Sequence, residues 1–309
     1  MKADKDIRQQ FADTMLEVGQ ADSRLVVVIG DISHFKLQPF AEACPGRFYN
    51  IGILEPTMIS MSAGLSKVGF LPVVHTIAPF IAERSLEQLK LDFGYQALPG
   101  NIVTVGSAFD YSNLGCSHHC YSDFALFKSI PTVQVTFPAS ALEFDLLFKQ
   151  SFDNAFLTTF RIPAQSHGVE WKPEEVKFGK GIRVTEGADV TVVVTGPQLK
   201  GAIEAHRSLA RKGLGVEIVY LHTIRPFDGE IVASSISKTR KVVVVEEHQR
   251  TGGIGQEVLE IAHGIGGVRF ASLCLPEAFV REYRSYEGHC SGLGLDAEGI
   301  VNSIESLLR

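Results

Sequence analysis

The feature that most constrains the fold of this chain is a regular alternation of short apolar runs with longer segments of helical apolar spacing. Apolar runs of strand length occur at 25–29, 71–75 and 101–105, and a helical pattern such as that at 58–67 lies between them. Strands that alternate with helices of this length favour a parallel sheet covered on both faces. The sequence therefore predicts an α/β fold.

The alternation continues along the chain and divides it into two units. In the first unit, further strands are predicted at 47–51 and 132–136, and helices at 7–18, 81–91 and 141–149. A polar stretch containing proline then interrupts the pattern, as is typical of a linker. In the second unit, strands are predicted at 190–195, 216–221 and 241–246, with helices before 213 and at 230–235 and 256–263. We expect two three-layer α/β/α domains with mostly parallel sheets, at 1–163 and 186–309, joined by a linker at 164–185.

Composition narrows the class of protein. The chain has 309 residues, 45% of them hydrophobic, which is enough for two apolar cores. Its net charge is −6 and its Lys and Arg residues are scattered, so no surface for a nucleic-acid backbone is predicted. The apolar runs are far shorter than the roughly 20 residues that span a bilayer, and the charged N-terminus does not resemble a signal peptide. The five cysteines then suggest reduced thiols, and we expect a cytoplasmic protein with neither membrane nor nucleic-acid partners.

The most informative segment begins at Arg47 and reads RFYNIGILEPTMISMSAGLSKVGFLPVVHTIAPF. It places Glu55 between the end of a predicted strand and the start of a helix. Ligands bind at this edge of an α/β sheet, and the helix dipole favours an anion there. Glu55 and Pro56 are equally compatible with the first turn of an ordinary helix, so the local pattern leaves both interpretations open.

This segment resembles the pyrimidine-binding domain of transketolases, in which Asn, Gly and then Glu introduce a glycine-containing helix. Glu55 falls at the position of the family's glutamate. The resemblance continues in order along the chain. Its first segment extends to Phe80, and further matching motifs lie at 115–118, 130–131, 138–139, 223–228 (TIRPFD) and 242–255 (VVVVEEHQRTGGIG). It covers almost the whole chain and implies a thiamine diphosphate pyrimidine-binding fold followed by a transketolase C-terminal domain.

The resemblance implies that Glu55 activates thiamine diphosphate. A carboxylic acid hydrogen-bonded to ring nitrogen N1′ shifts the aminopyrimidine towards its imino tautomer, which can take the proton from the thiazolium C2. The resemblance also implies that Phe80 stacks on the pyrimidine ring, which needs an aromatic face, and that Ile53 contributes to the same cofactor site. A buried core phenylalanine is the alternative interpretation of Phe80.

The motif that binds the diphosphate and its cation in transketolases does not occur in this sequence. That motif is Gly-Asp-Gly followed by Asn, which supplies oxygen ligands to Mg²⁺ or Ca²⁺, and residues 30–32 with Asn50 imitate it without the second glycine. The resemblance therefore implies that a separate N-terminal subunit of about 270 residues binds the diphosphate and the metal ion, and that this chain has no metal site. We expect a heterotetramer with two copies of each chain, self-association through the family interface, and no turnover by this chain alone.

The sequence GCSHHC at 115–120 brings two Cys and two His together, but their spacing does not match the usual pairs of zinc ligands. The resemblance implies instead that His118 is the catalytic histidine that contacts the donor sugar, with His119 as a neighbouring candidate. Arg161 resembles the arginine that binds the acceptor phosphate, for which a guanidinium fork is well suited. A surface or linker-capping arginine is the alternative interpretation of Arg161.

The sequence departs from transketolases just before His118. Transketolases carry Gly-Glu-Asp-Gly there, whereas this chain reads SNLG at 112–115, and Pro56 replaces the usual His or Gln after the glutamate. These changes alter the donor contact and leave open which sugars or sugar phosphates are the substrates.

The sequence thus predicts the C-terminal subunit of a split transketolase that transfers a two-carbon ketol unit between sugars. The β subunit of a 2-oxoacid dehydrogenase shares the architecture. A part of a deoxyxylulose phosphate synthase and a non-catalytic paralogue are further alternatives. The order of motifs after Glu55 and around His118 favours the transketolase.

Overall fold

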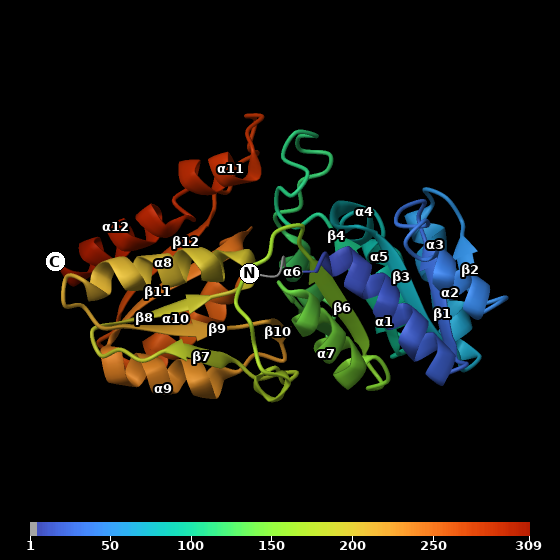
Figure 1. Ribbon diagram of the computed structural model, residues 1–309, viewed down its shortest axis with the longest axis horizontal. Helices are drawn as coiled ribbons and strands as arrows, with labels where there is room; N and C mark the ends of the chain where they lie inside the picture. Colours follow the sequence, from blue (N-terminus) through green and yellow to red (C-terminus); the bar gives the residue numbers. More distant parts are fainter. Residues whose placement is uncertain (1–4) are drawn as a thin grey trace.

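The computed structural model of the protein describes residues 5–309, which form two α/β domains side by side (Figure 1). The strands of the first sheet are β1 (Leu25–Ile29), β2 (Phe48–Asn50), β3 (Leu71–Ile77), β4 (Gly100–Val105), β5 (Val133–Thr136), β6 (Leu157–Ile162) and β10 (Thr223–Arg225). Their order is β10-β5-β6-β4-β3-β1-β2, and every pair is parallel except β10 with β5.

Helices cover both faces of this sheet. One face carries α1 (Ile7–Ala21), α2 (Gln38–Ala43) and α7 (Ala141–Ser151), and the other carries α3 (Glu55–Lys67), α4 (Ala78–Ala82), α5 (Leu86–Gln88), a π-helical turn (Leu89–Gly94) and α6 (Asp123–Lys128). Successive strand residues supply opposite cores. Val27 packs with the α1 side, whereas Val26 and Val28 pack with the α3 side. All five residues of β1 are buried, as expected for a central parallel strand.

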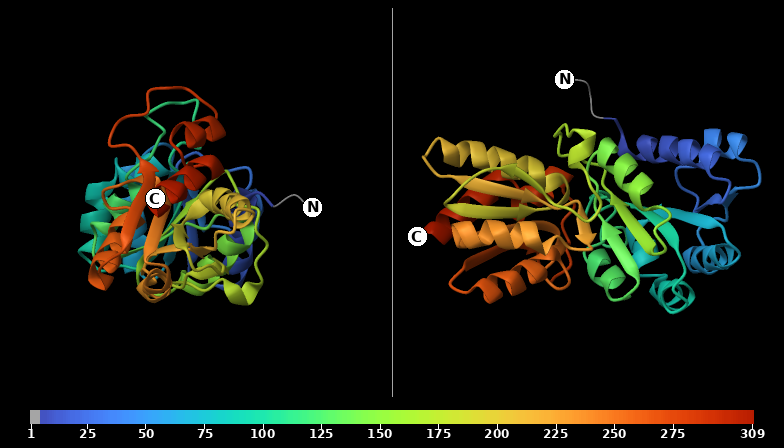
Figure 2. Two further views of the ribbon diagram at one scale, coloured as in Figure 1. Left: turned by 90° about the vertical axis from the view of Figure 1, so that its left-hand side faces the viewer. Right: turned by 90° about the horizontal axis from the view of Figure 1, so that it is seen from below.

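The second domain repeats this design on a smaller scale. Its sheet has the order β12-β11-β8-β9-β7, built from β7 (Ile182–Thr185), β8 (Val190–Val194), β9 (Val216–Tyr220), β11 (Lys241–Gln249) and β12 (Arg269–Leu275). Its helices are α8 (Leu199–Ala210) and α12 (Ala297–Leu308) on one face, α9 (Gly229–Thr239) and α10 (Ile254–Ile265) on the other, and α11 (Tyr286–Gly292) beside them. Seen from below, helices lie above and below each sheet (Figure 2). The predicted fold class, two three-layer domains with mostly parallel sheets, is confirmed.

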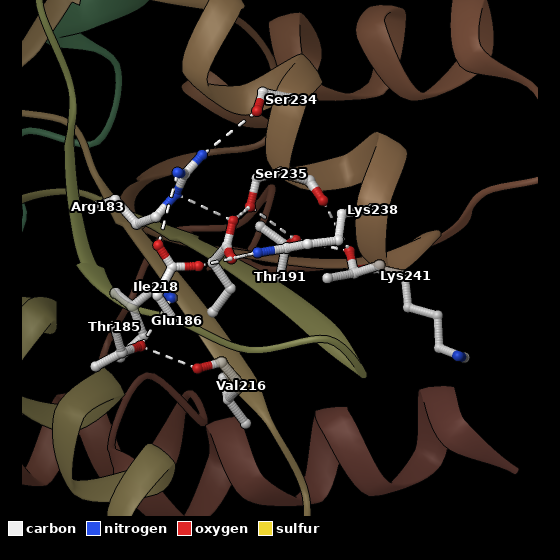
Figure 3. A network of polar contacts seen from close by, with 12 residues as sticks. Arg183, Thr185, Glu186, Thr191, Val216, Ile218, Ser234, Ser235, Lys238 and Lys241 are labelled. Atoms are coloured by element: carbon white, nitrogen blue, oxygen red, sulfur yellow. Dashed lines mark hydrogen bonds and ion pairs between the residues drawn. The ribbon is translucent and has the colours of Figure 1, made fainter.

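A buried carboxylate fixes the antiparallel edge of the second sheet. Arg183 of β7 and two residues of α9, Ser235 and Lys238, converge on the carboxylate of Glu217 in β9. Figure 3 shows the side chains of Arg183, Ser235 and Lys238 pointing towards one another. The Arg183 Nε lies 3.3 Å from Glu217 Oε1. Burial opposes ionisation of this carboxyl group, yet Lys238, Ser235 and Arg183 together lower the pKa of Glu217.

A second buried carboxylate, that of Glu143 on α7, joins the two domains. Its Oε2 accepts hydrogen bonds from the Ala139 N–H at 2.7 Å and from the Tyr220 hydroxyl of β9 at 2.9 Å. Its Oε1 lies 2.8 Å from His167 Nε2 and accepts from Trp171 Nε1 at 2.6 Å. The partners thus come from the first domain, the connecting segment and the second domain.

Two of the differences between the structure and the sequence-based expectations lie close to the candidate linker and to the helix after β3. The helix expected at 81–91 is broken into α4, α5 and the π-helical turn, where Gly94 packs so closely that a Cβ would lie 2.4 Å from Ile130 Cγ2. The last four residues of the expected linker form β7, which pairs antiparallel with β9. The sequence did not predict this strand, because β7 contains no continuous run of apolar residues. Among the helices of residues 5–309, none combines the length and apolar character needed to cross a membrane.

Candidate active site

Glu55 is the first residue of α3, as the sequence predicts, and its side chain is 1% exposed. The loop before it is shaped by Asn50, whose side-chain oxygen accepts from the N–H groups of Asp31 and Gly52, both at 3.1 Å. Gly52 has a φ of +76°, a left-handed conformation that suits glycine. These contacts tie the segments after β1 and β2 together at the carboxyl edge of the sheet and deliver Glu55 to the helix N-terminus.

The carboxylate of Glu55 has two side-chain partners. Arg84 Nη1 donates to Glu55 Oε2 at 2.6 Å, and Thr76 Oγ1 of β3 donates to Oε1 at 3.4 Å. Arg84 follows α4 and its side chain is 44% exposed, so a half-exposed cation covers a buried acid. The sequence analysis did not single out Arg84. Its only local signal is its position four residues after Phe80, a spacing that places two residues on one face of a helix.

Phe80 and His118 extend this arrangement. The Arg84 guanidinium carbon lies 4.3 Å from the centroid of the Phe80 ring, a cation–π contact. On Phe80 the ring of His118 packs edge-on, with 5.4 Å between centroids and an interplanar angle of 69°. We call Glu55, Phe80, Arg84 and His118 the Glu55 cluster. The members of this cluster come from distant parts of the chain, because 63 positions separate Glu55 from His118.

The two neighbouring histidines face different surroundings. His118 is half-buried, and its Nδ1 lies 3.0 Å from the Ser117 hydroxyl. His119 is buried, its Nδ1 lies 2.6 Å from the Tyr121 hydroxyl, and burial lowers its pKa. The ring of His119 also lies 5.9 Å from that of His289 in α11. His118 therefore joins the Glu55 cluster, whereas His119 packs towards the second domain.

The loop that carries both histidines lies beside the second domain. Figure 1 shows the segment between β4 and α6 rising on the same side of the molecule as α11. The Phe109 ring in this loop lies 5.1 Å from that of His289. At Gly115 the backbone is left-handed, with a φ of +75°, and a Cβ would lie 2.9 Å from the Tyr283 hydroxyl. The second domain thus supports the loop from behind.

Arg161 lies in the interior, 1% exposed, and not in the Glu55 cluster. Its guanidinium carbon is 4.7 Å from the Phe124 ring and 4.5 Å from the Phe137 ring. Its Nη2 donates to the Glu247 carbonyl at 3.1 Å, and its Nε lies 3.4 Å from an Asp123 carboxylate oxygen. Contact of Arg161 with a substrate phosphate stays a prediction, and it requires the guanidinium to leave these partners.

Ile53 lies in the loop before α3 and is 65% exposed. Its neighbour Leu54 is 55% exposed, and Phe35, in the segment after β1, is also exposed. These three apolar side chains flank the carboxyl edge of the sheet on which the buried Glu55 lies.

The chemistry of the Glu55 cluster fits the aminopyrimidine ring of thiamine. Such a ring needs an acid for its ring nitrogen and an aromatic face for stacking, and Glu55 and Phe80 supply both. Within residues 5–309, no group of three or more His, Cys, Asp or Glu side chains is placed to hold a metal ion.

Comparisons with known proteins identify the family. Residues 3–167 match the family described as "Transketolase, pyrimidine binding domain", and residues 179–299 match "Transketolase, C-terminal domain". The chain therefore belongs to the transketolase family, and it comprises the pyrimidine-binding and C-terminal portions.

Its relatives include proteins that are themselves separate subunits. The chain is 30% identical to the 6-deoxy-6-sulfo-D-fructose transketolase subunit SqwH of Clostridium sp. strain MSTE9, over 82% of this chain and 80% of that protein. It is 30% identical to an apulose-4-phosphate transketolase subunit of Phocaeicola vulgatus, over 96% of this chain and 95% of that protein. It is also 29% identical to the 1-deoxy-D-xylulose-5-phosphate synthase of Syntrophotalea carbinolica, over 97% of this chain but 48% of that protein.

Solved structures agree with this assignment. A structure described as "Split gene transketolase, inactive beta4 tetramer" superposes with a TM-score of 0.88 at 27% identity and covers 99% of both chains. The transketolase of Campylobacter jejuni shares the fold with a TM-score of 0.82 at 15% identity, over 98% of this chain and 47% of that one.

Proposed function

We propose that this chain is the C-terminal subunit of a thiamine diphosphate-dependent transketolase-type transferase that moves a two-carbon ketol unit between sugars. The observation that carries the proposal is the buried carboxyl group of Glu55 at the first turn of α3, which Arg84 links to the face of Phe80, with His118 packed edge-on against Phe80. Thiamine diphosphate, when bound, would supply the carbon nucleophile for transfer of the ketol unit.

The residues of this chain have distinct tasks in the proposed reaction. Glu55 lends a proton to the ring nitrogen N1′, and burial keeps water from competing for that hydrogen bond. Phe80 holds the ring by stacking, and Ile53 adds apolar contact at the edge of the site. His118 contacts the oxygens of the sugar. His119 is the second candidate for this contact, but it is buried and packs within the loop. We call the Glu55 carboxyl group and the face of Phe80 covered by Arg84 the pyrimidine seat.

A separate subunit binds the diphosphate and its Mg²⁺ or Ca²⁺ in this proposal. The exposed side chains of Phe35, Ile53 and Leu54, at the edge that carries Glu55, suit burial under such a partner. The relatives described as subunits support the same arrangement. We expect two copies of each chain, with this chain also contacting its own copy, as the tetramer of the split-gene relative suggests.

The substrates are sugars or sugar phosphates. Two relatives are described as transketolases for a sulfonated and a phosphorylated sugar, so an anionic group at the far end of the substrate is the first possibility to test. Leu114 is exposed in the SNLG segment just before His118 and makes this side of the site more apolar than the acidic run of typical transketolases.

The test is to purify this chain with its diphosphate-binding partner and measure thiamine diphosphate binding and ketol transfer from a panel of donors. The panel contains neutral, phosphorylated and sulfonated ketoses, and also pyruvate, which a deoxyxylulose phosphate synthase uses. Glu55→Gln should lower turnover by about 10²–10⁴-fold, the usual contribution of a positioned acid. Glu87→Gln, at an exposed position of α5, is the matched control and should leave turnover unchanged. Full turnover by the Glu55→Gln complex contradicts the proposal.

A further inference from the structure

Arg84 makes the two contacts that the proposed function assigns to the cofactor ring. Its guanidinium donates to the Glu55 carboxylate at 2.6 Å, and its carbon lies 4.3 Å from the centroid of the Phe80 ring. A guanidinium is flat and carries N–H groups at its edge, so it resembles an aminopyrimidine in shape and in the groups it contacts. The pyrimidine seat is thus filled by a side chain of the protein itself.

The arrangement with Arg84 in the seat excludes the proposed chemistry. A guanidinium stays protonated and only donates, so Arg84 pairs with the ionised form of Glu55. Lending a proton to N1′ requires the protonated form of the same carboxyl group. Because both partners also need the same face of Phe80, the seat holds either Arg84 or the ring.

The Arg84 side chain can move away from the pyrimidine seat, whereas the Glu55 side chain is fixed. The Arg84 side chain is 44% exposed and follows the end of α4, and within residues 5–309 the polar partner of its guanidinium is Glu55. Glu55 is 1% exposed and fixed in the first turn of α3. Water can solvate the half-exposed guanidinium once it leaves, and the ring that replaces it is hydrogen-bonded to Glu55 in turn, so the exchange does not leave the buried carboxyl group without a partner.

We propose that Arg84 is an internal occupant of the pyrimidine seat, which pairs with the Glu55 carboxylate and covers Phe80 until the pyrimidine ring displaces it. This inference rests on the proposed function. If Arg84 fills the seat for most of the time, the apparent dissociation constant for a pyrimidine equals the intrinsic one divided by the fraction of molecules in which the seat is open.

The test uses the isolated chain and a neutral probe, 4-amino-5-hydroxymethyl-2-methylpyrimidine, which has the ring of the cofactor without its thiazolium charge. Dissociation constants are measured by NMR titration for wild type and for Arg84→Met, which keeps an apolar stem and removes the guanidinium. We expect Arg84→Met to bind about tenfold more tightly, which corresponds to a seat that is open for about a tenth of the time in the wild type. Arg207→Met, an exposed position on α8, is the matched control and should match the wild type.

Two further variants separate occupation of the seat from charge alone. Arg84→Lys keeps the charge but presents no flat group to Phe80, so it should also bind the neutral probe more tightly. Arg84→Gln replaces Arg84→Met if the latter does not fold. Unchanged or weaker binding by the folded Arg84 variants overturns the inference, whether or not the assembled enzyme works. Failure of the complex with its partner to bind thiamine diphosphate overturns the proposed function instead.

Discussion

Replacing Glu143 by Gln should loosen the junction between the two domains. The Glu143 carboxylate is fully buried and has four hydrogen-bond partners, two at each oxygen. A glutamine keeps one oxygen and turns the other into an N–H₂ donor. The Tyr220 hydroxyl can then act as an acceptor, but the Ala139 N–H at one oxygen and the Trp171 Nε1–H at the other cannot. His167 Nε2 cannot either, because its Nδ1 accepts from the Val169 N–H and the proton is therefore on Nε2.

Either orientation of the glutamine therefore sets two donors against each other in the interior. One orphaned buried donor costs about 1–3 kcal/mol, and the remaining bonds lose the assistance of the charge. Relief of the desolvation of a buried carboxylate offsets part of this loss. We expect Glu143→Gln to lower the free energy of unfolding by about 2–4 kcal/mol.

The assay is urea denaturation of wild type and Glu143→Gln at several pH values. Burial by itself raises the pKa of Glu143, but the charge and hydrogen bond of His167 and the Ala139 N–H outweigh it and lower the pKa below the ordinary 4.5. The contribution of Glu143 is therefore complete above about pH 4.5 and is lost as the pH falls through the lowered value. Glu143→Gln should be less stable at pH 7 and should lose less stability on acidification.

The control for this experiment is Glu204→Gln, at an exposed position of α8, which should change stability by no more than about 0.5 kcal/mol. The reasoning is refuted if Glu143→Gln differs from the wild type by no more than this control at pH 7. It is also refuted if the two proteins lose stability equally on acidification.

Two further predictions concern buried groups near the sheet ends. Gly196→Ala should lower the free energy of unfolding by about 2–4 kcal/mol, since the φ of Gly196 is +67° and a Cβ would lie 2.1 Å from Phe137 Cε1. Gly266→Ala is the control, because Gly266 has a φ of +71° but open space around it, and it should cost about 1–2 kcal/mol. Equal effects of the two substitutions would exclude the Phe137 contact as the cause. Burial lowers the pKa of His75 to about 3, although its hydrogen bond to the Val103 carbonyl opposes the shift. The NMR chemical shifts of its imidazole carbons should therefore stay constant from pH 7 to pH 4, while the free energy of unfolding falls as the pH drops from about 6.5 towards 3. A titration of these chemical shifts with a midpoint near pH 6.5 would contradict this prediction.

Most of the strands predicted correctly from the sequence are buried on both faces; β2, expected at 47–51, is the exception, because it is a largely exposed edge strand. β1 was expected at 25–29 and has those bounds, because a central parallel strand reads as an unbroken apolar run. β6 was not predicted, since its sequence LTTFRI contains polar residues that are nevertheless buried, Arg161 among them. β12 is only half-buried and β10 has three residues, so neither carries a clear periodicity. Pairing with distant strands defines these elements, and a local pattern does not contain it.

The candidate site divides in the same way. The position of Glu55 follows from a local rule, the junction of a strand end with a helix start, and the structure places it there. The contacts of Phe80 and His118 depend on how α4 and the loop before α6 fold back on each other. Arg84 could not be assigned from sequence, because no local pattern tells which carboxylate a half-exposed arginine will meet.

The position of Arg84 explains why folding of this chain and readiness for catalysis are separate events in the proposed function. Folding buries the acid of Glu55 at the edge of the sheet and leaves apolar side chains such as Ile53 exposed around it. A buried carboxylate without a partner is costly, so the isolated chain needs a cation there, and Arg84 supplies it. In the proposed function, a neutral ring and an apolar partner surface take the place of Arg84 and cover the acid. The contact that stabilises the free chain is thus the one that assembly has to break.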